Sequence, residues 1–361
     1  MRILFDHQTF THQDYGGISR YFYELATRLA TYNDVDVRSS IKFSNNEYIA
    51  GNKVLPSATF FKGKRFKGKM RLHLLLNEMY SKKVLRKSDY DIFHPTYYDT
   101  YHVALTASKP VVVTCLDMIH EKFIKDDAKT ADNKKKLLHR ADRILAISEN
   151  TKKDVVEYYG ISPNKISVTY LASSIVAAPG ASKDANDKFF LYVGKRNLYK
   201  NFAPFVTALA PLLQKHNDVI LKCAGGGPWE PEELELVKKL GITDKVKLVG
   251  ASNADLQRHY STALAFIFPS LYEGFGIPVL EAMNCGCPVA LSDTSSLPEV
   301  GGDAAIYFNP YDGNSMLNVF TRLLEDAALR RELVNKGNVQ AKLFSWDATA
   351  RSTHEVYKSL L

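Results

Sequence analysis

Two glutamates stand eight residues apart in the segment PSLYEGFGIPVLEAMNCGCPV, which runs from Pro269 to Val289. The apolar run at its start is typical of a buried strand, and Glu273 then falls in a turn that contains two glycines. Pro278 suits the first turn of a helix, where its missing N–H costs nothing. Glu281 is therefore expected about one turn inside that helix.

The start of this helix is expected to add hydrogen-bond donors between the two carboxylates. The first N–H groups of a helix have no partner within the helix, and here they belong to Phe275, Gly276 and Ile277. Carboxylates and N–H groups together can hold a sugar hydroxyl, a ribose diol and a diphosphate. The alternative is that both acids only complement the helix dipole, which suits Glu281 better than Glu273 beside its glycines.

Two cations follow another expected strand, in the segment LYVGKRNLYKNF from Leu191 to Phe202. Arg196 and Lys200 lie in the loop after this strand, and Asn201 is expected to cap the next helix. Arginine can bind two phosphate oxygens at once and lysine supplies a point charge, so this pair suits a diphosphate. The alternative is a pair of solvated surface cations.

A glycine pair, Gly16 and Gly17 in YGGIS, follows the first expected strand and begins a helix. Glycine lets a ligand approach the backbone closely, and a helix N-terminus attracts anions, so phosphate binding is one interpretation and a plain turn is the other. The pair does not form G-x-G-x-x-G, and no acid stands at the offset of a nicotinamide ribose site. These absences argue against an NAD-dependent Rossmann oxidoreductase.

Short apolar runs alternate with helical patterns in the first half of the chain, which indicates a parallel sheet with crossover helices. The expected strands are Arg2–Asp6, Val35–Ile41, Asp91–His94, Pro110–Cys115, Arg143–Ile147 and Lys165–Thr169. The expected helices are Ile18–Thr31, Met70–Leu85, Lys129–Arg140 and Asn150–Tyr159.

The same alternation starts again after residue 187. The expected strands are Phe189–Gly194, Val219–Ala224, Val246–Gly250, Ala265–Pro269, Pro288–Ser292 and Ala305–Asn309. The expected helices are Phe202–Gln214, Glu232–Leu240, Ala254–Thr262, Pro278–Met283, Ser315–Glu325, Ala328–Leu343 and Ser345–Leu361. We therefore expect an α/β protein with two doubly wound domains, 1–172 and 188–344, joined by a linker at 173–187 that is rich in Ala, Ser, Pro, Gly and Asp. Ligands are expected outside the carboxyl ends of the strands.

The composition excludes a disordered and a collagen-like protein. The 361 residues are 45% hydrophobic and 24% charged, as in ordinary globular proteins, and no apolar run is long enough to cross a membrane. The N-terminus is expected to form the first strand rather than a signal peptide. The four cysteines lack the spacing of a zinc site and are expected to be buried, reduced thiols of a cytosolic protein.

The net charge of +8 is concentrated in one segment, 60–87. Its cations are Lys62, Lys64, Arg65, Lys67, Lys69, Arg71, Lys82, Lys83, Arg86 and Lys87, against the single acid Glu78. Cations interleaved with Phe and Leu favour an anionic membrane surface, where a lipid-diphosphate-linked acceptor would dock. The alternative is a solvated loop followed by a core helix. Nucleic-acid binding is not favoured, because no recognition helix, zinc finger or stacking aromatics are apparent.

Five segments together resemble glycosyltransferase family 4, whose members retain anomeric configuration and have the GT-B fold. The segment FPSLYEGFGIPVLEAMNCGCPV is similar to the family's E-x7-E signature. GGISRY, YVGKRNLYKNF, AISENTKKDVVEYYGI and SSLPEVGGDAAIYFNP stand in the order of the family's other blocks. The resemblance implies two Rossmann-like domains that face a central cleft, the first for the acceptor and the second for the nucleotide sugar. It also implies that helix 345–361 crosses back to the first domain.

The resemblance also implies roles for individual residues in this pattern. Glu281 would bind the ribose hydroxyls, and Glu273 would contact the donor sugar. Arg196 and Lys200 would stabilise the departing diphosphate, and Gly16 and Gly17 would approach the same phosphates. No metal ion is expected, because cations and helix N-termini would do its work.

One segment departs from the family pattern. Many relatives have a His-Asp pair after the fourth strand, whereas this chain has Leu116 before Asp117 and a histidine, His120, three residues later. Asp117 or His120 is expected to orient the sugar or the acceptor hydroxyl, with His120 as a candidate proton acceptor. The alternatives are a structural loop histidine and a reaction in which the departing diphosphate takes the proton.

Within the family, DMIHEKF together with SSLPEVGGDAA is most similar to the mannosyltransferase branch. The expected donor is therefore GDP-mannose, with UDP-glucose or UDP-N-acetylglucosamine as the alternative. The expected acceptor is a lipid-linked or growing surface glycan, such as lipopolysaccharide. The expected location is the cytoplasm, peripherally on the inner face of the cell membrane.

Overall fold

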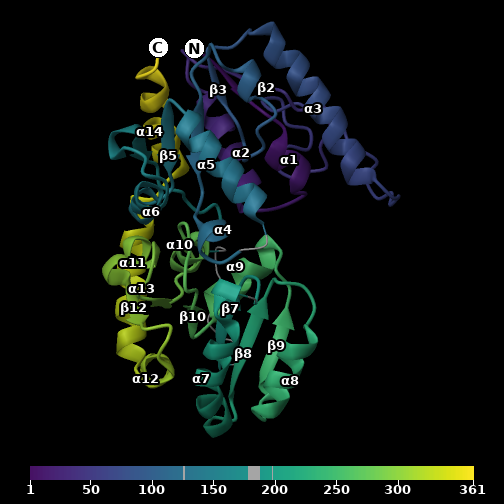
Figure 1. The fold of residues 1–361 in the computed structure, drawn as a ribbon. Helices are drawn as coiled ribbons and strands as arrows, with labels where there is room; N and C mark the ends of the chain where they lie inside the picture. The colour runs from purple at the N-terminus through teal and green to yellow at the C-terminus, as the bar shows by residue number, and fades with distance from the viewer. Residues whose placement is uncertain (125–126, 178–187, 197) are drawn as a thin grey trace. The chain divides into compact units, whose positions relative to one another are not determined.

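The computed structural model describes residues 1–124, 127–177, 188–196 and 198–361. They divide into two compact units, which are Met1–Leu171 with Trp346–Leu361 (the first unit) and Ala172–Ser345 (the second unit). Each unit contains a parallel sheet with helices between successive strands (Figure 1). Of the expected linker, residues 178–187 lie outside the described residues.

The sheet of the first unit is built from two sets of three parallel strands. Their orders are β2-β1-β3 and β4-β5-β6, and a parallel bridge between Phe93 and Val111 joins the sets. The strands are β1 (Arg2–Phe5), β2 (Asp36–Ser39), β3 (Ile92–His94), β4 (Val112–Cys115), β5 (Arg143–Ala146) and β6 (Ile166–Val168). Strand β1 lies between β2 and β3, so the chain leaves β1 toward β2 on one side and leaves β3 toward β4 on the other.

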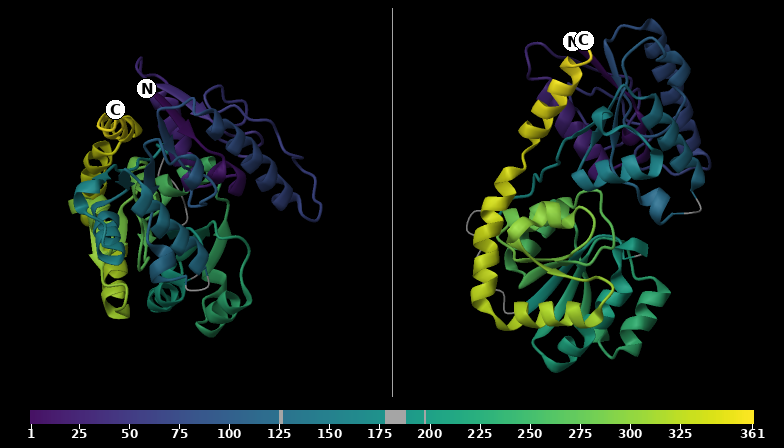
Figure 2. Two further views of the ribbon diagram at one scale, coloured as in Figure 1. Left: turned by 45° about the horizontal axis from the view of Figure 1, so that its top comes forward. Right: turned by 60° about the vertical axis from the view of Figure 1, so that its left-hand side comes forward.

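Helices connect these strands, and one arrives from the far end of the chain. The helices of this unit are α1 (Gln8–His12), α2 (Gly17–Leu29), α3 (Lys69–Lys87), α4 (Ile119–Lys122), α5 (Ala128–Arg140), α6 (Glu149–Tyr159) and α14 (Trp346–Lys358). Helix α14 packs beside α2 (Figure 2), and the Tyr357 hydroxyl lies 2.6 Å from Nδ1 of the buried His94. The expected return of the C-terminal helix to the first domain is therefore confirmed.

The second unit contains one six-stranded parallel sheet in the order β12-β11-β10-β7-β8-β9. Its strands are β7 (Lys188–Val193), β8 (Val219–Ala224), β9 (Val246–Val249), β10 (Ala265–Phe268), β11 (Val289–Ser292) and β12 (Ala305–Phe308). The strand order reverses between β7 and β10. Such a switch point opens a crevice at the carboxyl ends of the strands, where ligands bind in doubly wound sheets.

Helices of the second unit bury a large aromatic core against this sheet. They are α7 (Phe202–Lys215), α8 (Pro231–Lys239), α9 (Asn253–Thr262), α10 (Ile277–Asn284), α11 (Leu297–Gly301), α12 (Gly313–Glu325) and α13 (Ala327–Gln340). Phe205 of α7 packs edge-on against Phe320 of α12, which in turn contacts Phe190 of β7. This packing holds β7 against α7 and α12.

Every expected strand and helix is present, with ends shifted by at most three residues. The short helices α1, α4 and α11 were not expected, because four or five residues are too few to show a helical period. Helix α1 stands between β1 and the glycine pair. Across the described residues, no helix is long and apolar enough to span a bilayer.

Candidate active site

A lysine and a glutamate meet at the switch point of the second unit. Lys200 ends a 3₁₀ turn (Leu198–Lys200) after β7, and Glu273 lies in the turn after the neighbouring strand β10. Lys200 Nζ donates to Glu273 Oε1 over 2.6 Å, and the two side chains are only 15% and 11% exposed. Sequence spacing alone gave no sign of this ion pair, because 73 residues separate its members.

Two serines fix the backbone of the turn that carries Glu273. The Glu273 N–H donates to Ser295 Oγ over 3.0 Å. Ser296 Oγ lies 2.9 Å from the Glu273 carbonyl and 3.0 Å from that of Phe275, and donates to these oxygens. Ser295 itself has a positive φ of 54°, a conformation that non-glycine residues rarely adopt. Both serines belong to the segment SSLPEVGGDAA, to which sequence analysis assigned no individual role.

The N-terminus of α10 lies directly after this turn. Gly276 precedes the helix with φ of 106°, and an added Cβ would stand 3.1 Å from Leu297 Cδ2, so only glycine fits without strain. Among the described residues, none accepts a hydrogen bond from the N–H of Gly276 or Ile277. Two of the three expected donors are therefore available to a ligand, while the Phe275 ring packs against Phe344.

Glu281 lies inside α10 and is buried, with 6% exposure. The Tyr260 hydroxyl donates to Glu281 Oε2 over 3.2 Å. Burial, followed by the negative charge of Glu281, raises the pKa of Tyr260 well above its usual value, so this hydroxyl stays protonated. Tyr260 was not expected in the site, and it orients the carboxylate predicted to bind ribose.

All three guanidinium nitrogens of Arg196 donate hydrogen bonds to protein groups. Its Nε lies 3.0 Å from both carboxylate oxygens of Glu233, and its other nitrogens donate to the carbonyls of Gly225, Gly227 and Pro228. The guanidinium also stacks over Trp229 at 4.8 Å. The diphosphate role assigned to Arg196 stays a prediction, and it requires phosphate oxygens to replace some of these partners. In the arrangement described here, Arg196 fixes the loop 225–228.

Replacing this side chain should therefore affect stability. Arg196→Ala leaves Glu233 and three carbonyls without their buried donor, and breaking a buried pair of this kind costs about 3–5 kcal/mol. We expect that loss in the free energy of unfolding, measured by urea denaturation. Arg322→Ala, on the exposed face of α12, is the control and should change it by less than about 0.5 kcal/mol. An Arg196→Ala protein as stable as the wild type would contradict this structural role.

Asn201 stands at the expected position before α7, but the expected capping bond is wrong. Its backbone adopts a positive φ of 57°, which turns the side chain away from the first N–H groups of the helix. The amide instead donates to the Pro310 carbonyl over 2.9 Å. Asn201 thereby ties the end of the Lys200 loop to the segment after β12.

In the first unit, the glycine pair begins α2 as expected. Gly16 is the residue before the helix and Gly17 its first residue. A Cβ on Gly16 would stand 2.6 Å from Gln13 Oε1, and this same oxygen accepts the Ser19 N–H over 3.1 Å. A side chain therefore already satisfies one early donor of α2. Phosphate binding by Gly16 and Gly17 stays a prediction.

Asp117 and His120 lie after the carboxyl end of β4, in a segment that hydrogen bonds hold in place. Asp117 Oδ1 accepts the Ile119 N–H over 3.0 Å. The fully buried Lys134 donates to the Asp117 carbonyl over 3.0 Å and to Glu121 over 2.9 Å. His120 Nε2 lies 3.5 Å from Asp127 Oδ2, and its Nδ1 is buried without a hydrogen-bond partner among the described residues. Lys134 was not predicted as part of the site, because its sequence context is that of any lysine on a surface helix.

Comparisons with known proteins agree with this geometry. A family model described as "Glycosyltransferase Family 4" matches residues 15–172, and one described as "Glycosyl transferases group 1" matches residues 178–340. The chain belongs to glycosyltransferase family 4. The two matches fall on the two units, so the expected family is confirmed over nearly the whole chain.

Relatives of this family 4 chain include two proteins of Escherichia coli. O-antigen chain mannosyltransferase B is 31% identical over 62% of each chain. The serotype-specific mannosyltransferase WbdA is 30% identical over 73% of this chain and 35% of its own length. The chain therefore spans less than two thirds of these two relatives.

Solved structures confirm the expected GT-B fold. Sucrose-phosphate synthase from Thermosynechococcus elongatus matches with a TM-score of 0.79 and 21% identity, over 99% of this chain and 98% of that one. HepE from Anabaena, in complex with UDP-glucose, matches with a TM-score of 0.77 and 18% identity over the whole of both chains. At these identities the likeness concerns the fold alone.

Proposed function

We propose that this chain is a retaining glycosyltransferase that moves a hexose from a nucleoside diphosphate sugar to a lipid-linked or growing glycan. The observation that carries the proposal is the Lys200–Glu273 pair at the switch point of the second unit, beside the N-terminus of α10. A cation, a carboxylate and available N–H groups in one place match a diphosphate joined to a polyol. The family to which the chain belongs supports the same reaction.

Each group has one task in the proposed complex. Lys200 and the N–H groups of Gly276 and Ile277 bind the diphosphate, Glu273 binds hydroxyls of the donor sugar, and Glu281 binds the ribose. In the transfer, the bond between the anomeric carbon and the diphosphate oxygen breaks, and the acceptor oxygen bonds to that carbon on the same face. The acceptor proton passes to the departing diphosphate. Fixed cations and N–H dipoles stabilise the charge that develops there, as a metal ion does in other transferases.

GDP-mannose is the donor that we propose first. The names of the two E. coli relatives, both mannosyltransferases, support mannose. UDP-glucose or UDP-N-acetylglucosamine is the second candidate, and the complex of HepE with UDP-glucose favours a uridine donor on the same fold.

We further propose that segment 60–87 binds an anionic membrane surface. Helix α3 is turned with polar residues inward: Asn77 donates to Thr11 Oγ1 over 2.8 Å and to the Phe43 carbonyl over 2.9 Å. Several of its apolar residues face outward, and Met79 and Leu75 are 60% and 54% exposed. The helix lies along the margin of the first unit (Figures 1 and 2). The expected alternative, a solvated loop followed by a core helix, accounts for the buried inner face of α3. The exposed apolar residues on its outer face suit the acyl boundary of a membrane, and this supports the proposal.

A basic cavity lies at the start of the same helix. It has a volume of about 650 Å³ and is lined by Thr11, Asp14, Asn45, His73 and residues 64–71. Lys64, Arg65, Lys67 and Arg71 form no ion pair with any described residue. Unpaired cations around a cavity are suited to lipid phosphates, each contributing about 1 kcal/mol near an anionic leaflet.

Charge reversal tests this surface. The quadruple variant K64E/R65E/K67E/R71E should lose at least about tenfold in binding to vesicles that contain anionic phosphatidylglycerol, because four attractive charges become repulsive. Flotation at low and high salt measures this. The control K238E/K239E, on α8 of the second unit, should bind like the wild type. Equal flotation of the quadruple variant would remove this surface from the proposal.

Ligand-dependent stability tests the proposed reaction class. We expect GDP or GDP-mannose at 100 times its dissociation constant to stabilise the protein by about 2.7 kcal/mol, seen as a rise in melting temperature. UDP and UDP-glucose test the second donor, and NAD tests an oxidoreductase. Stabilisation by NAD alone, or by no nucleotide, would contradict the proposal.

A further inference from the structure

A second polar cavity lies in the first unit, apart from the Lys200–Glu273 pair. Its volume is about 320 Å³, within the range of small-molecule sites. It is lined by Thr9, His12, Gln13, Tyr97, Asp127 and Thr130. These residues follow β1 and β3 or begin α5, so the cavity stands at the carboxyl edge of the sheet.

This position is the switch point of the first sheet. Strand β1 pairs with β2 on one side and β3 on the other, and the chain after β1 and the chain after β3 supply two walls of the cavity. Diverging connections at such a point leave a crevice that binds ligands. The sheet thus offers a binding position that neither the glycine pair nor Asp117 occupies.

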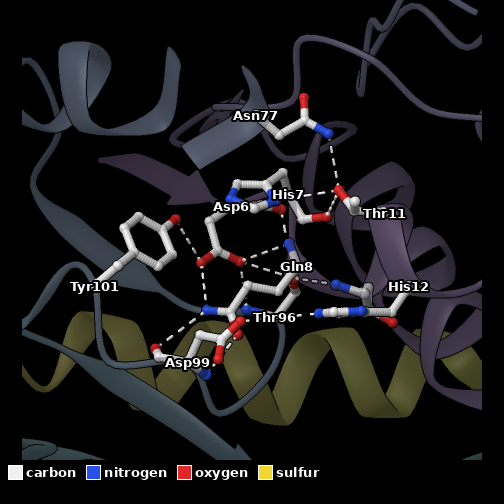
Figure 3. A network of polar contacts seen from close by, with 10 residues as sticks. Asp6, His7, Gln8, Thr11, His12, Asn77, Thr96, Asp99 and Tyr101 are labelled. Carbon is white, nitrogen blue, oxygen red and sulfur yellow. Dashed lines mark hydrogen bonds and ion pairs between the residues drawn. The ribbon is translucent and has the colours of Figure 1, made fainter. Parts of the chain in front are cut away.

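A buried network holds the wall formed by His12 (Figure 3). Asp6 is fully buried and accepts hydrogen bonds from Gln8 Nε2 and Thr96 Oγ1, both over 2.7 Å, and from the Tyr101 hydroxyl over 2.9 Å. Gln8 Oε1 in turn accepts the Asp99 N–H over 2.7 Å. Asp6 therefore fixes the turns after β1 and β3 relative to each other.

Asp99 extends this network to the cavity. Its Oδ2 lies 3.8 Å from His12 Nε2, and the interaction with His12 lowers the pKa of Asp99 despite partial burial. The carboxylate thus stays ionised and orients the imidazole at the cavity wall. The Tyr97 ring lies beside it, with 6.2 Å between the ring centroids.

One group in the cavity wall lacks a hydrogen-bond partner. Thr9 lines the cavity and is 2% exposed, and its buried hydroxyl has no hydrogen-bond partner among the described residues. Buried hydroxyls are normally satisfied, so an unpaired one in a cavity wall indicates a ligand position. On the other wall, Asp127 connects the cavity to His120.

The composition of the walls identifies the class of ligand. The described residues that line the cavity include no Lys or Arg, which argues against a phosphate or a nucleotide. They offer an aromatic ring together with hydroxyl, amide, imidazole and carboxylate groups. A pyranose presents a face of C–H groups and a rim of hydroxyls, which such a set can contact and hydrogen-bond.

We propose that this cavity is a saccharide subsite that binds a pyranose of the acceptor glycan against Tyr97. His12, positioned by Asp99, and the Thr9 hydroxyl bind its hydroxyls from one wall, and Asp127 binds them from the other. Its assignment to the acceptor rests on the proposed function, whereas saccharide binding itself does not. His12 is a positioning residue here and takes no part in bond breaking.

Saturation-transfer NMR with methyl α-D-mannopyranoside and methyl α-D-glucopyranoside tests the subsite on the full chain. We expect saturable binding of at least one glycoside, and at least about tenfold weaker binding by Tyr97→Ala and by His12→Ala, as expected for a lost ring contact or hydrogen bond. Tyr97→Phe keeps the ring and should bind within about threefold of the wild type. It also reports on binding if Tyr97→Ala folds poorly.

Matched controls separate this cavity from other surfaces. Tyr158→Ala and His139→Ala remove an exposed ring and an exposed imidazole elsewhere in the first unit and should bind like the wild type. Glu325→Gln, at the exposed end of α12 in the second unit, should also keep the binding. Glycoside binding that is absent in the wild type, or unchanged in Tyr97→Ala and His12→Ala, would overturn the subsite. Nucleotide stabilisation of the same samples judges the proposed function separately.

Discussion

Glu273→Gln is expected to lower sugar transfer by at least about 10³-fold with little change in fold. The substitution keeps the size of the side chain and an oxygen that can accept from Lys200, but it removes the charge that faces the donor sugar and the ammonium group. Losing one preorganised electrostatic group in a closed site lowers kcat by about 10²–10³-fold. The loss of the charged partner of Lys200 should lower kcat further. Release of nucleotide from the sugar donor measures the rate.

Controls distinguish this loss from a folding defect. Glu325→Gln, at the exposed end of α12, should transfer sugar at the wild-type rate. The free energy of unfolding of Glu273→Gln should fall by about 1–3 kcal/mol, the cost of weakening one largely buried charged hydrogen bond. A folded Glu273→Gln protein with near-normal turnover would exclude Glu273 from the site.

Lys200→Ala should reduce kcat by about 10²–10³-fold and also weaken nucleotide binding. The ammonium group lies at the switch point, beside the proposed diphosphate position. Water that fills the space left by the side chain would not replace the attraction between this charge and the phosphates. The control Lys215→Ala, at the exposed end of α7, should be neutral. Steady-state kinetics and calorimetry with GDP and UDP measure the two effects.

The ion pair predicts coupling between these two variants. Because Lys200 and Glu273 contact each other, the double variant should lose less activity than the product of the two single losses. Full additivity, or a Lys200→Ala protein that binds nucleotide as tightly as the wild type, would show that the pair does not act as one unit.

The fold was predictable to the level of elements because each buried strand is a short apolar run and each long helix shows its period. The strand order was not predictable, since no local pattern states that β10 lies beside β7. For the same reason, Lys200 and Glu273 were each identified as candidates without any sign that they touch. Arg196 shows the reverse case: its type and position predicted a phosphate ligand, while its partners in the loop 225–228 depend on a turn that the sequence does not specify.

Residues that support the site were the hardest to predict. Ser295, Ser296 and Tyr260 contact the predicted glutamates only through tertiary packing. Asp99 and His12 lie 87 residues apart and become neighbours because β1 pairs with β3. Polar residues of ordinary type acquire a role through the sheet that brings them together, and single-sequence patterns do not carry that information.

The most direct test of the central claim is a crystal structure of the chain with GDP or UDP, grown in the presence of EDTA. We expect phosphate oxygens within about 3.2 Å of Lys200 Nζ and of the N–H groups of Gly276 and Ile277, with the ribose at Glu281. A diphosphate bound away from Lys200, or bound only when a divalent metal ion is supplied, would contradict it.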